Sequence, residues 1–290
     1  MDSRPRPGTS ASLRLRLLGS PLIRVILATV VVFVAVLLAQ SFAHLFRDIV
    51  PASLYYLLYV IASVLVACFA YVAYVRVVER RTVSELSTEG AVQELGAGVA
   101  IGAGLVIVVV AALWVLGYYA VVGTNAGTVL LIAFANDASG AVVEEILFRA
   151  IVFRISEEAL GTWLALLVSI LLFGLVHIGE PGAIPVALAA SLLLCCAYML
   201  TRRLWLPIGI HFAWDFTQDG VFGVGAGVKG LMQAELTGPS PLSGGETGIE
   251  ASALALVAVL VAGLYLLLRA SRQRKLVEPP WRRRTLPSRP

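Results

Sequence analysis

Charged residues are scarce in this sequence. Asp, Glu, Lys and Arg make up 14% of its 290 residues, whereas soluble domains contain about 25%. Hydrophobic residues supply 59% of the chain, and the mean hydropathy is +0.89. This balance argues against a soluble domain and places the chain in a lipid bilayer.

Cysteine is also rare, and positive charge is confined to particular segments. Cys68, Cys195 and Cys196 lie in apolar runs without the spacing of metal ligands, so we expect them to be small core residues. The net charge of +4 could suggest nucleic acid, but the basic residues crowd the two tails and the short loops. That distribution is typical of orientation in a membrane, and we expect no nucleic-acid partner.

Apolar stretches long enough to span a bilayer recur along the chain. They predict an all-α, polytopic membrane helix bundle with about eight transmembrane helices. The expected parts are a disordered basic tail at 1–20, two transmembrane helices and a polar connector at 21–94, a core of helices at 95–220, an extramembrane loop at 221–250, and a last transmembrane helix with a basic tail at 251–290.

The basic residues predict one orientation. If both termini are cytoplasmic, every basic loop falls on the cytoplasmic side, as the positive-inside rule requires; these are the connector at 76–81, Arg154 and Arg202-Arg203. We therefore expect an integral protein of a bacterial-type plasma membrane with both termini in the cytoplasm. The first apolar run could instead belong to a cleaved signal peptide, but we favour a retained span because the orientation requires it.

Three details of this pattern can be checked directly. The polar connector, Arg76 to Glu94, is expected to be an interfacial or cytoplasmic helix whose charges face solvent. The third span is expected at Leu95 to Val122, where Gly98 and Gly102 would permit close helix approach. A fourth helix is expected from about Thr128 to about Glu157.

One charged cluster interrupts the apolar pattern, at Glu144-Glu145-Ile146-Leu147-Phe148-Arg149. Ionisable groups at membrane depth cost about 2.5–3.5 kcal/mol each on insertion scales, so they indicate function. On a helix, Glu145 and Arg149 share a face and can pair. Glu144 is rotated about 100° away and has no cationic partner in its own turn. We therefore predict a structural role for Glu145 and an available carboxylate at Glu144.

Two histidines lie in other apolar segments, and each has a partner four residues away on the same helical face. Phe173 precedes His177, and Asp215 follows His211. A lone histidine in the membrane is commonly a packing residue. Polar sites on three successive membrane helices offset their cost only by meeting, so we expect Glu144, His177 and His211 to surround one polar cavity.

Two chemistries fit such a cavity. In one, Glu144 and His177 deprotonate a water that attacks an amide carbonyl, and His211 with Asp215 stabilises the oxyanion. In the other, Glu144, His177 and His211 ligate a divalent metal such as zinc, with water in the open position. The HExxH helix of soluble metalloproteases is absent, and the sequence alone does not choose between the two.

These residues resemble the motifs of a known family. EEILFR at 144–149 is similar to the EExxxR motif of the CAAX protease and bacteriocin-processing (CPBP) family, which includes the Ras-converting prenyl endopeptidase and the Abi immunity proteins. Phe173 to His177 resembles its FxxxH motif, and His211 to Asp215 its HxxxN or HxxxD motif. The resemblance covers about residues 90 to 220, so the core at 95–220 would be its catalytic part.

The resemblance implies an intramembrane endopeptidase that cuts a membrane-associated peptide or protein. By it, Glu144 would activate water with His177, His211 and Asp215 would support the oxyanion or a metal, and Glu145, Arg149 and Phe173 would support the site. Asp215 stands where the prenyl endopeptidases carry Asn, so it is expected to orient His211, or to be protonated if it stabilises an oxyanion. Ala150 replaces the Gly that often follows the arginine of the EExxxR motif in this family. The identity of the substrate, and whether it is prenylated, does not transfer.

Two other functions compete with the peptidase. A non-proteolytic scaffold or immunity protein of the same fold would not need Glu144, His177 and His211 together. A proton-coupled transporter could use membrane Glu and His, but it predicts inverted repeats and paired broken helices. Only one span, at Pro207, is interrupted by proline, so the transporter ranks last.

Overall fold

The computed structural model describes residues 19–283, so nearly all of the predicted basic tail at 1–20, and the end of the last tail at 284–290, lie outside the described residues. The structure contains these elements in order: α2 (Pro21–His44), α3 (Ala52–Tyr74), η1 (Val75–Glu79), α4 (Ala91–Val115), β1 (Tyr119–Thr124), α5 (Thr128–Glu145), η2 (Ile146–Phe153), α6 (Arg154–Leu160), α7 (Thr162–Val176), α8 (Ile184–Thr201), α9 (Trp205–Asp215), η3 (Phe216–Phe222), β2 (Met232–Leu236), α10 (Ser240–Ser243), η4 (Gly245–Thr247), η5 (Ile249–Ala251), α11 (Ala253–Arg272) and α12 (Pro280–Arg283).

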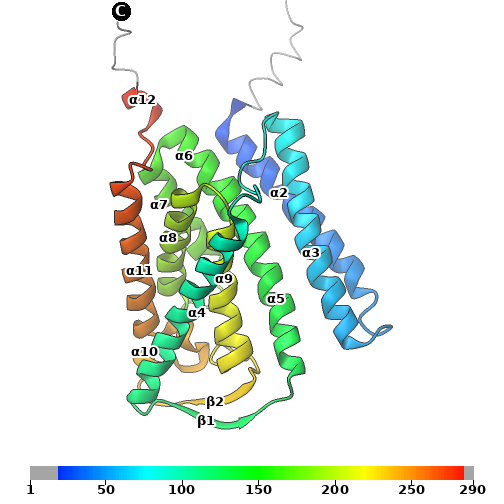
Figure 1. Ribbon diagram of the computed structural model, residues 1–290, viewed down its shortest axis with the longest axis vertical. Coiled ribbons are helices and arrows are strands. Elements are labelled where there is room, and N and C mark those ends of the chain that lie inside the picture. The colour runs from blue at the N-terminus through cyan, green and yellow to red at the C-terminus, as the bar shows by residue number, and fades with distance from the viewer. Residues whose placement is uncertain (1–18, 284–290) are drawn as a thin grey trace, which may run out of the picture.

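The helices form a bundle with a hairpin at its side. In the bundle, α4 packs on α9, α7 and α11 pack on α8, and α5 packs on α9 and η3. The α2–α3 hairpin packs on α5 and, near the end that is uppermost in Figure 1, on η2 and α6. The predicted helical bundle is therefore confirmed. The charged cluster at 144–149, in the fourth predicted helix, lies where the hairpin packs on the bundle.

The membrane character of the chain is visible in its surface. Five of the described helices, α2, α3 with η1, α4, α8 and α11, are long and apolar enough to span a bilayer. Large apolar side chains such as Phe33, Phe69 and Trp114 are more than half exposed, as lipid-facing residues are expected to be. The protein is thus an integral membrane protein.

All eight segments predicted as spans contain helix, but three of them are short or polar. Helix α5 carries three acidic residues, α7 has 15 residues, and α9 has 11. The structure therefore supports five spans by length and composition, and the count of eight stays a prediction.

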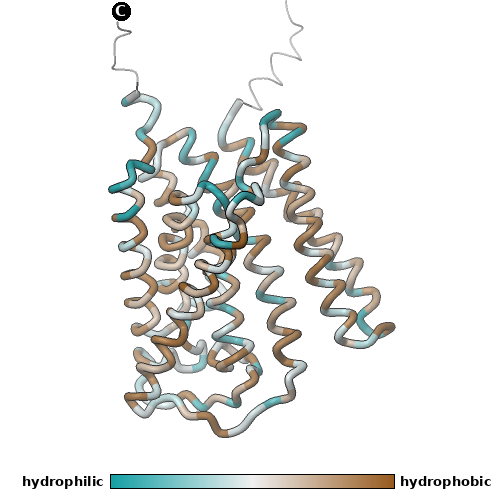
Figure 2. Tube along the Cα trace, in the orientation of Figure 1, coloured by the Kyte–Doolittle hydropathy of each residue, from teal (hydrophilic) through white to brown (hydrophobic). Residues whose placement is uncertain are grey.

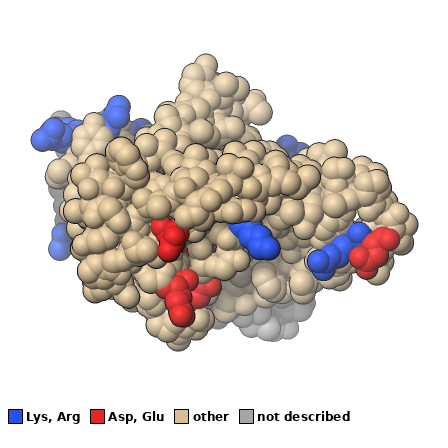
Figure 3. Space-filling view, turned by 90° about the horizontal axis from the view of Figure 1, so that it is seen from below, with Lys and Arg blue, Asp and Glu red and all other residues tan. Residues whose placement is uncertain are grey.

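The two ends of the molecule differ in charge. Hydrophilic residues gather at the upper ends of several helices in Figure 2, where α3, α6 and the end of α11 lie. The opposite end, seen from below in Figure 3, is mostly uncharged and carries isolated charged side chains. This asymmetry agrees with the orientation that the basic loops predict.

A π-helix follows each of two candidate site residues directly. The fourth predicted helix is continuous from α5 to α6, but its middle, η2, is π-helical and begins immediately after Glu145. Helix α9 likewise passes into the π-helix η3 after Asp215. π-helical turns are rare and occur frequently at functional sites.

Glycines bring α4 and α9 into close contact, as the spacing of Gly98 and Gly102 predicts. A Cβ atom at Gly98 would overlap the carbonyl oxygen of Leu206, and one at Gly102 would overlap that of Ile210. From the other side, a Cβ at Gly209 would lie 2.5 Å from the carbonyl oxygen of Leu95. This contact fixes the position of α9, and hence of His211, against the bundle.

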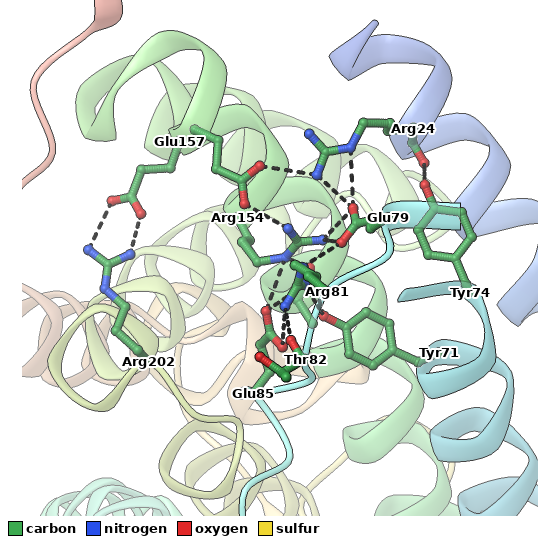
Figure 4. Close-up of polar contacts among 12 residues, drawn as sticks. Arg24, Tyr71, Tyr74, Glu79, Arg81, Thr82, Glu85, Arg154, Glu157 and Arg202 are labelled. Carbon is green, nitrogen blue, oxygen red and sulfur yellow. Dashed lines mark hydrogen bonds and ion pairs between the residues drawn. The ribbon is translucent and has the colours of Figure 1, made fainter. Parts of the chain in front are cut away.

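The polar connector differs from the prediction of a solvent-facing helix. Residues 80–90 contain no helix, and two of its acids, Glu79 and Glu85, are almost completely buried. Glu79 accepts from Arg24, Arg81 and Arg154 at 2.7–2.9 Å, and Glu85 pairs with Arg81 and Arg154 (Figure 4). The prediction was wrong because these charges pair with Arg24 and Arg154, which are distant in sequence, and a local pattern does not reveal such contacts.

The end opposite this ionic cluster holds a small sheet that the sequence did not predict. Strands β1 and β2 pair antiparallel, with Tyr119 opposite Leu236. The third predicted span was therefore too long: α4 ends at Val115, and Gly117 takes a positive φ of 75° before β1. The loop predicted at 221–250 is also more ordered than expected, since it contributes part of η3, β2 and three short helices.

Candidate active site

Glu145 lies at the centre of the candidate site and is fully buried. Its Oε1 atom accepts a hydrogen bond from Arg149, one helical turn later, at 3.0 Å. The same oxygen lies 2.8 Å from Nδ1 of His211 on α9. Because a carboxylate only accepts, His211 donates its Nδ1 proton to Glu145. The predicted Glu145–Arg149 pair is confirmed, and Glu145 also orients His211, which the sequence analysis missed.

Phe173 on α7 connects the acidic cluster to both histidines. The guanidinium of Arg149 lies over its ring, 4.6 Å from the centroid, a cation–π contact that partly replaces the hydrogen bonds missing at the buried Nε and Nη2 atoms of Arg149. The ring also lies against His177, at 4.9 Å between centroids, and against His211, at 6.3 Å. This position agrees with the supporting role predicted for Phe173.

His177 follows the last residue of α7. Its Nδ1 atom lies 2.8 Å from the carbonyl oxygen of Phe173, so that nitrogen carries the proton and donates it. In the neutral ring, Nε2 then keeps its lone pair and is free to accept a proton from a water. The FxxxH spacing thus holds the histidine in one tautomer through the backbone of its own helix.

The second nitrogen of His211 faces two further carboxylates. Nε2 lies 3.3 Å from Oδ2 of Asp215 and 3.9 Å from Oε2 of Glu144. Asp215, which was expected to orient His211, lies against Nε2 together with Glu144, while Glu145 holds the opposite nitrogen, Nδ1. The structure therefore brings Glu144, Glu145, His211 and Asp215 together from α5 and α9.

A cavity runs along α8 beside these side chains. His177, His211 and Asp215 line it together with Phe173 and Glu250 of η5. The rest of its wall is apolar and belongs mainly to α8, with Val259 from α11. One end of the cavity is therefore polar and carries the histidines, and the remainder suits apolar groups.

Glu144 is not among the residues that line this cavity, so of the three side chains predicted to surround one cavity only His177 and His211 share it; Glu144 borders a separate groove. The groove lies between the α2–α3 hairpin and α5, and Tyr59, Asn136 and Ser139 share its lining with Glu144. The Glu144 side chain is 37% exposed, whereas Glu145 is fully buried. As the sequence predicts, Glu144 has no Arg or Lys partner among residues 19–283, and it lies between this groove and His211.

The arrangement of donors does not fit a metal centre. Within residues 19–283, no three His, Cys, Asp or Glu side chains are grouped as they would be around a metal ion. No catalytic step is therefore derived through a metal, and the zinc centre considered from the sequence stays a prediction for metal analysis.

Several polar residues of this region escaped the sequence analysis as site candidates. Glu250 lines the cavity. The side-chain amide of Gln218 donates hydrogen bonds to the carboxylates of Glu250 and of the adjacent Asp219. All three belong to or adjoin the segment predicted as a loop, and only the fold carries that segment to the cavity. No short motif marks them.

Comparison with known proteins identifies the segment that holds the site. No curated protein and no solved structure matches the chain. Residues 125–217, which include Glu144, His177, His211 and Asp215, match the family model described as "Type II CAAX prenyl endopeptidase Rce1-like". For this segment, the match confirms the resemblance of the three motifs to the CAAX protease family.

Proposed function

We propose that this protein is an intramembrane endopeptidase that hydrolyses a peptide bond in a membrane-associated protein or peptide, with a water activated by Glu144 and His177. One observation carries the proposal. Within residues 19–283, Glu144 forms no ion pair with Arg or Lys, and its Oε2 lies 3.9 Å from Nε2 of His211, whose ring lies against Phe173 together with that of His177.

The first step needs a base. Glu144 would take a proton from a water, and the water oxygen would attack the carbonyl carbon of the peptide bond. His177, whose Nε2 lone pair is free, would hold the second hydrogen of that water. When the C–N bond breaks, Glu144 would return its proton to the leaving nitrogen, so that the products are a carboxylic acid and an amine.

The attack creates negative charge on the carbonyl oxygen. His211 is placed to stabilise it, because a doubly protonated ring would donate Nδ1–H to Glu145 and direct Nε2–H toward the side of Asp215 and Glu144. A carboxylate at each nitrogen supports the protonated ring. Asp215 accepts hydrogen bonds but does not donate when ionised, so its part would be to hold His211.

The supporting residues would fix this geometry. Arg149 neutralises Glu145 in the protein interior, and Glu145 in turn positions His211. Phe173 lies against Arg149 and both imidazole rings. We infer that these three residues act through others and do not touch the substrate.

The expected partners are the bilayer and a peptide or protein substrate, and the expected orientation has both termini in the cytoplasm of a bacterial-type cell. A scaffold or immunity protein of the same fold, or less favourably a proton-coupled transporter, would use the same bundle without cleavage. Tautomer control of His177 and the Glu145–His211 bond favour catalysis, because a scaffold needs neither.

The test is cleavage by the purified, full-length protein in lipid vesicles. Glu144→Gln, His177→Ala and His211→Ala should each abolish cleavage of a peptide mixture and leave thermal unfolding close to that of wild type. Glu246→Gln, an exposed acid far along the chain, is the matched control and should cleave normally. Full activity of any of the three variants would remove that residue from the mechanism.

Metal analysis belongs to the same experiment. The proposed mechanism predicts cleavage that persists after treatment with a chelator, in protein without stoichiometric metal. Loss of activity on chelation that zinc restores would instead require a metal-dependent mechanism.

A further inference from the structure

The groove beside Glu144 faces the lipid. On its hairpin side lie Phe33 and Leu37 of α2, which are 55% and 50% exposed. Both belong to a helix that is long and apolar enough to span a bilayer. The groove has a volume of about 470 Å³, within the roughly 300–1,000 Å³ typical of ligand sites. A molecule dissolved in the bilayer can therefore enter it sideways.

Glu144 is reached from this groove and not from the cavity along α8, because it lines the first and not the second. It is also the one charged residue among those that line the groove. A water activated by Glu144 attacks a carbonyl carbon only from a distance of about 3–3.5 Å. Under the proposed mechanism, the peptide bond that is cut must therefore lie in the groove.

Uncharged polar groups extend along the groove from Glu144. Asn136 and Ser139 supply an amide and a hydroxyl from α5, and Tyr59 supplies a hydroxyl from α3. Within residues 19–283, the side chains of Asn136 and Tyr59 form no hydrogen bond. Polar groups without partners are unfavourable where lipid excludes water. The N–H and C=O groups of an unwound peptide would pair with them, whereas a hydrocarbon chain offers no such partner.

Gly140 leaves space in the groove one helical turn before Glu144. A Cβ atom there would meet no atom within 4 Å, and its φ is not positive, so neither packing nor backbone conformation requires glycine. By contrast, a Cβ at Gly98 or Gly102 would overlap α9. Side chains four apart on a helix are about 5–6 Å from each other, which is one or two residues of an extended chain. The space over Gly140 therefore suits a substrate side chain close to the cut bond.

We propose that this groove binds an unwound, membrane-embedded segment of the substrate polypeptide, which enters sideways from the bilayer and places a side chain next to the cut bond over Gly140. The inference rests on the proposed peptidase function and names its substrate class. Much of the apolar wall of the groove belongs to α2, which precedes the segment 125–217 that matches the family model. This selectivity is therefore supplied by a part of the chain outside that segment.

Photolabelling tests which molecule occupies the groove. The probe is a synthetic peptide of about 20 apolar residues, long enough to span the bilayer, with a central Asn-Pro pair that unwinds it and a diazirine-bearing leucine beside that pair. It is added to full-length Glu144→Gln protein in lipid vesicles, where no cleavage occurs, and the attached residues are located by mass spectrometry. Label should be found on the groove residues of α2 and α5. A short peptide with the same leucine and one prenyl chain should label them about tenfold less, as the loss of one or two hydrogen bonds would give.

Two matched pairs of variants localise the site. Gly140→Leu fills the space and should reduce labelling at least about tenfold, the factor typical of one apolar group too many in a pocket, whereas Gly104→Leu, on α4, also meets open space and should not. Leu37→Trp narrows the groove from α2 and should reduce labelling too. Leu38→Trp, the next residue and 65% exposed, lies outside the groove lining and should have no effect. All four variants should unfold near the wild-type temperature.

The same experiment separates failure of the groove from failure of the peptidase. Label found only on other helices, equal labelling by the prenylated peptide, or labelling that survives both Gly140→Leu and Leu37→Trp would overturn the groove assignment. Labelling in the groove without hydrolysis of the same peptide by the wild type would instead contradict the peptidase function and leave the groove assignment in place.

Discussion

Arg149 offers the sharpest test of how the candidate site is held together. Arg149 and Glu145 are both fully buried, and their ion pair of 3.0 Å is formed in the protein interior. Among residues 19–283, Arg149 is the one Arg or Lys that contacts Glu145, so Arg149→Ala leaves Glu145 with His211 alone. It also removes the guanidinium from the face of Phe173. The remaining Glu145 would be a buried charge compensated only by the hydrogen bond from His211.

The expected loss follows from that stranded charge. Breaking a buried pair by removing one partner costs about 3–5 kcal/mol. At about 2–4 °C per kcal/mol for a chain of this size, the unfolding temperature should fall by about 6–20 °C. Arg269→Ala, an exposed arginine at the end of α11, is the control and should change stability by less than about 0.5 kcal/mol.

A second substitution separates the charge from the lost packing. Glu145→Gln in the Arg149→Ala background removes the stranded charge but keeps an oxygen for Nδ1 of His211. The double variant should therefore unfold at a higher temperature than Arg149→Ala alone, as measured by differential scanning fluorimetry in one detergent. A double variant equal to or less stable than Arg149→Ala would refute the reasoning, because lost contacts would then explain the whole effect.

Two further predictions concern the packing around the site and the loop acids. Gly102→Ala places a Cβ on the carbonyl oxygen of Ile210 and should lower both stability and cleavage, whereas Gly104→Ala, with open space around it, should be neutral or slightly stabilising in the same assays. The pKa of Asp219 is raised from 3.8 to about 7, so between these values the folded state keeps a proton that the unfolded chain loses. This difference in bound protons contributes to the free energy of unfolding below pH 4, and the contribution is lost as the pH rises through about 7. The unfolding temperature of wild type should therefore fall relative to that of Asp219→Asn between pH 5 and pH 8, and parallel curves would contradict this assignment.

Much of the site could be predicted from sequence because its motifs are local. The four-residue spacings of Glu145 with Arg149, Phe173 with His177, and His211 with Asp215 place each pair on one helical face, and each pair is in contact in the structure. The cost of ionisable groups in the bilayer then predicts that they meet. Glu144 and His211 do so at 3.9 Å.

The errors arose where contacts join distant segments. Glu145 was assigned a structural role only, because its bond to His211 spans 66 residues and no local pattern contains it. The connector was predicted to face solvent, yet Glu79 and Glu85 are buried by arginines that lie up to 75 residues away. Glu250 reaches the cavity only because η5 packs against α8. Tertiary placement, and not propensity, decides these roles.

The central claim is that Glu144 activates a water for attack on a peptide bond. Its most direct test is cleavage of a peptide mixture in water enriched in oxygen-18, followed by mass spectrometry of the new carboxyl termini. The wild type should produce fragments that carry one heavy oxygen at the new carboxylate, and Glu144→Gln should produce none. Identical labelled fragments from Glu144→Gln, or no fragments from a folded wild type, would contradict the account.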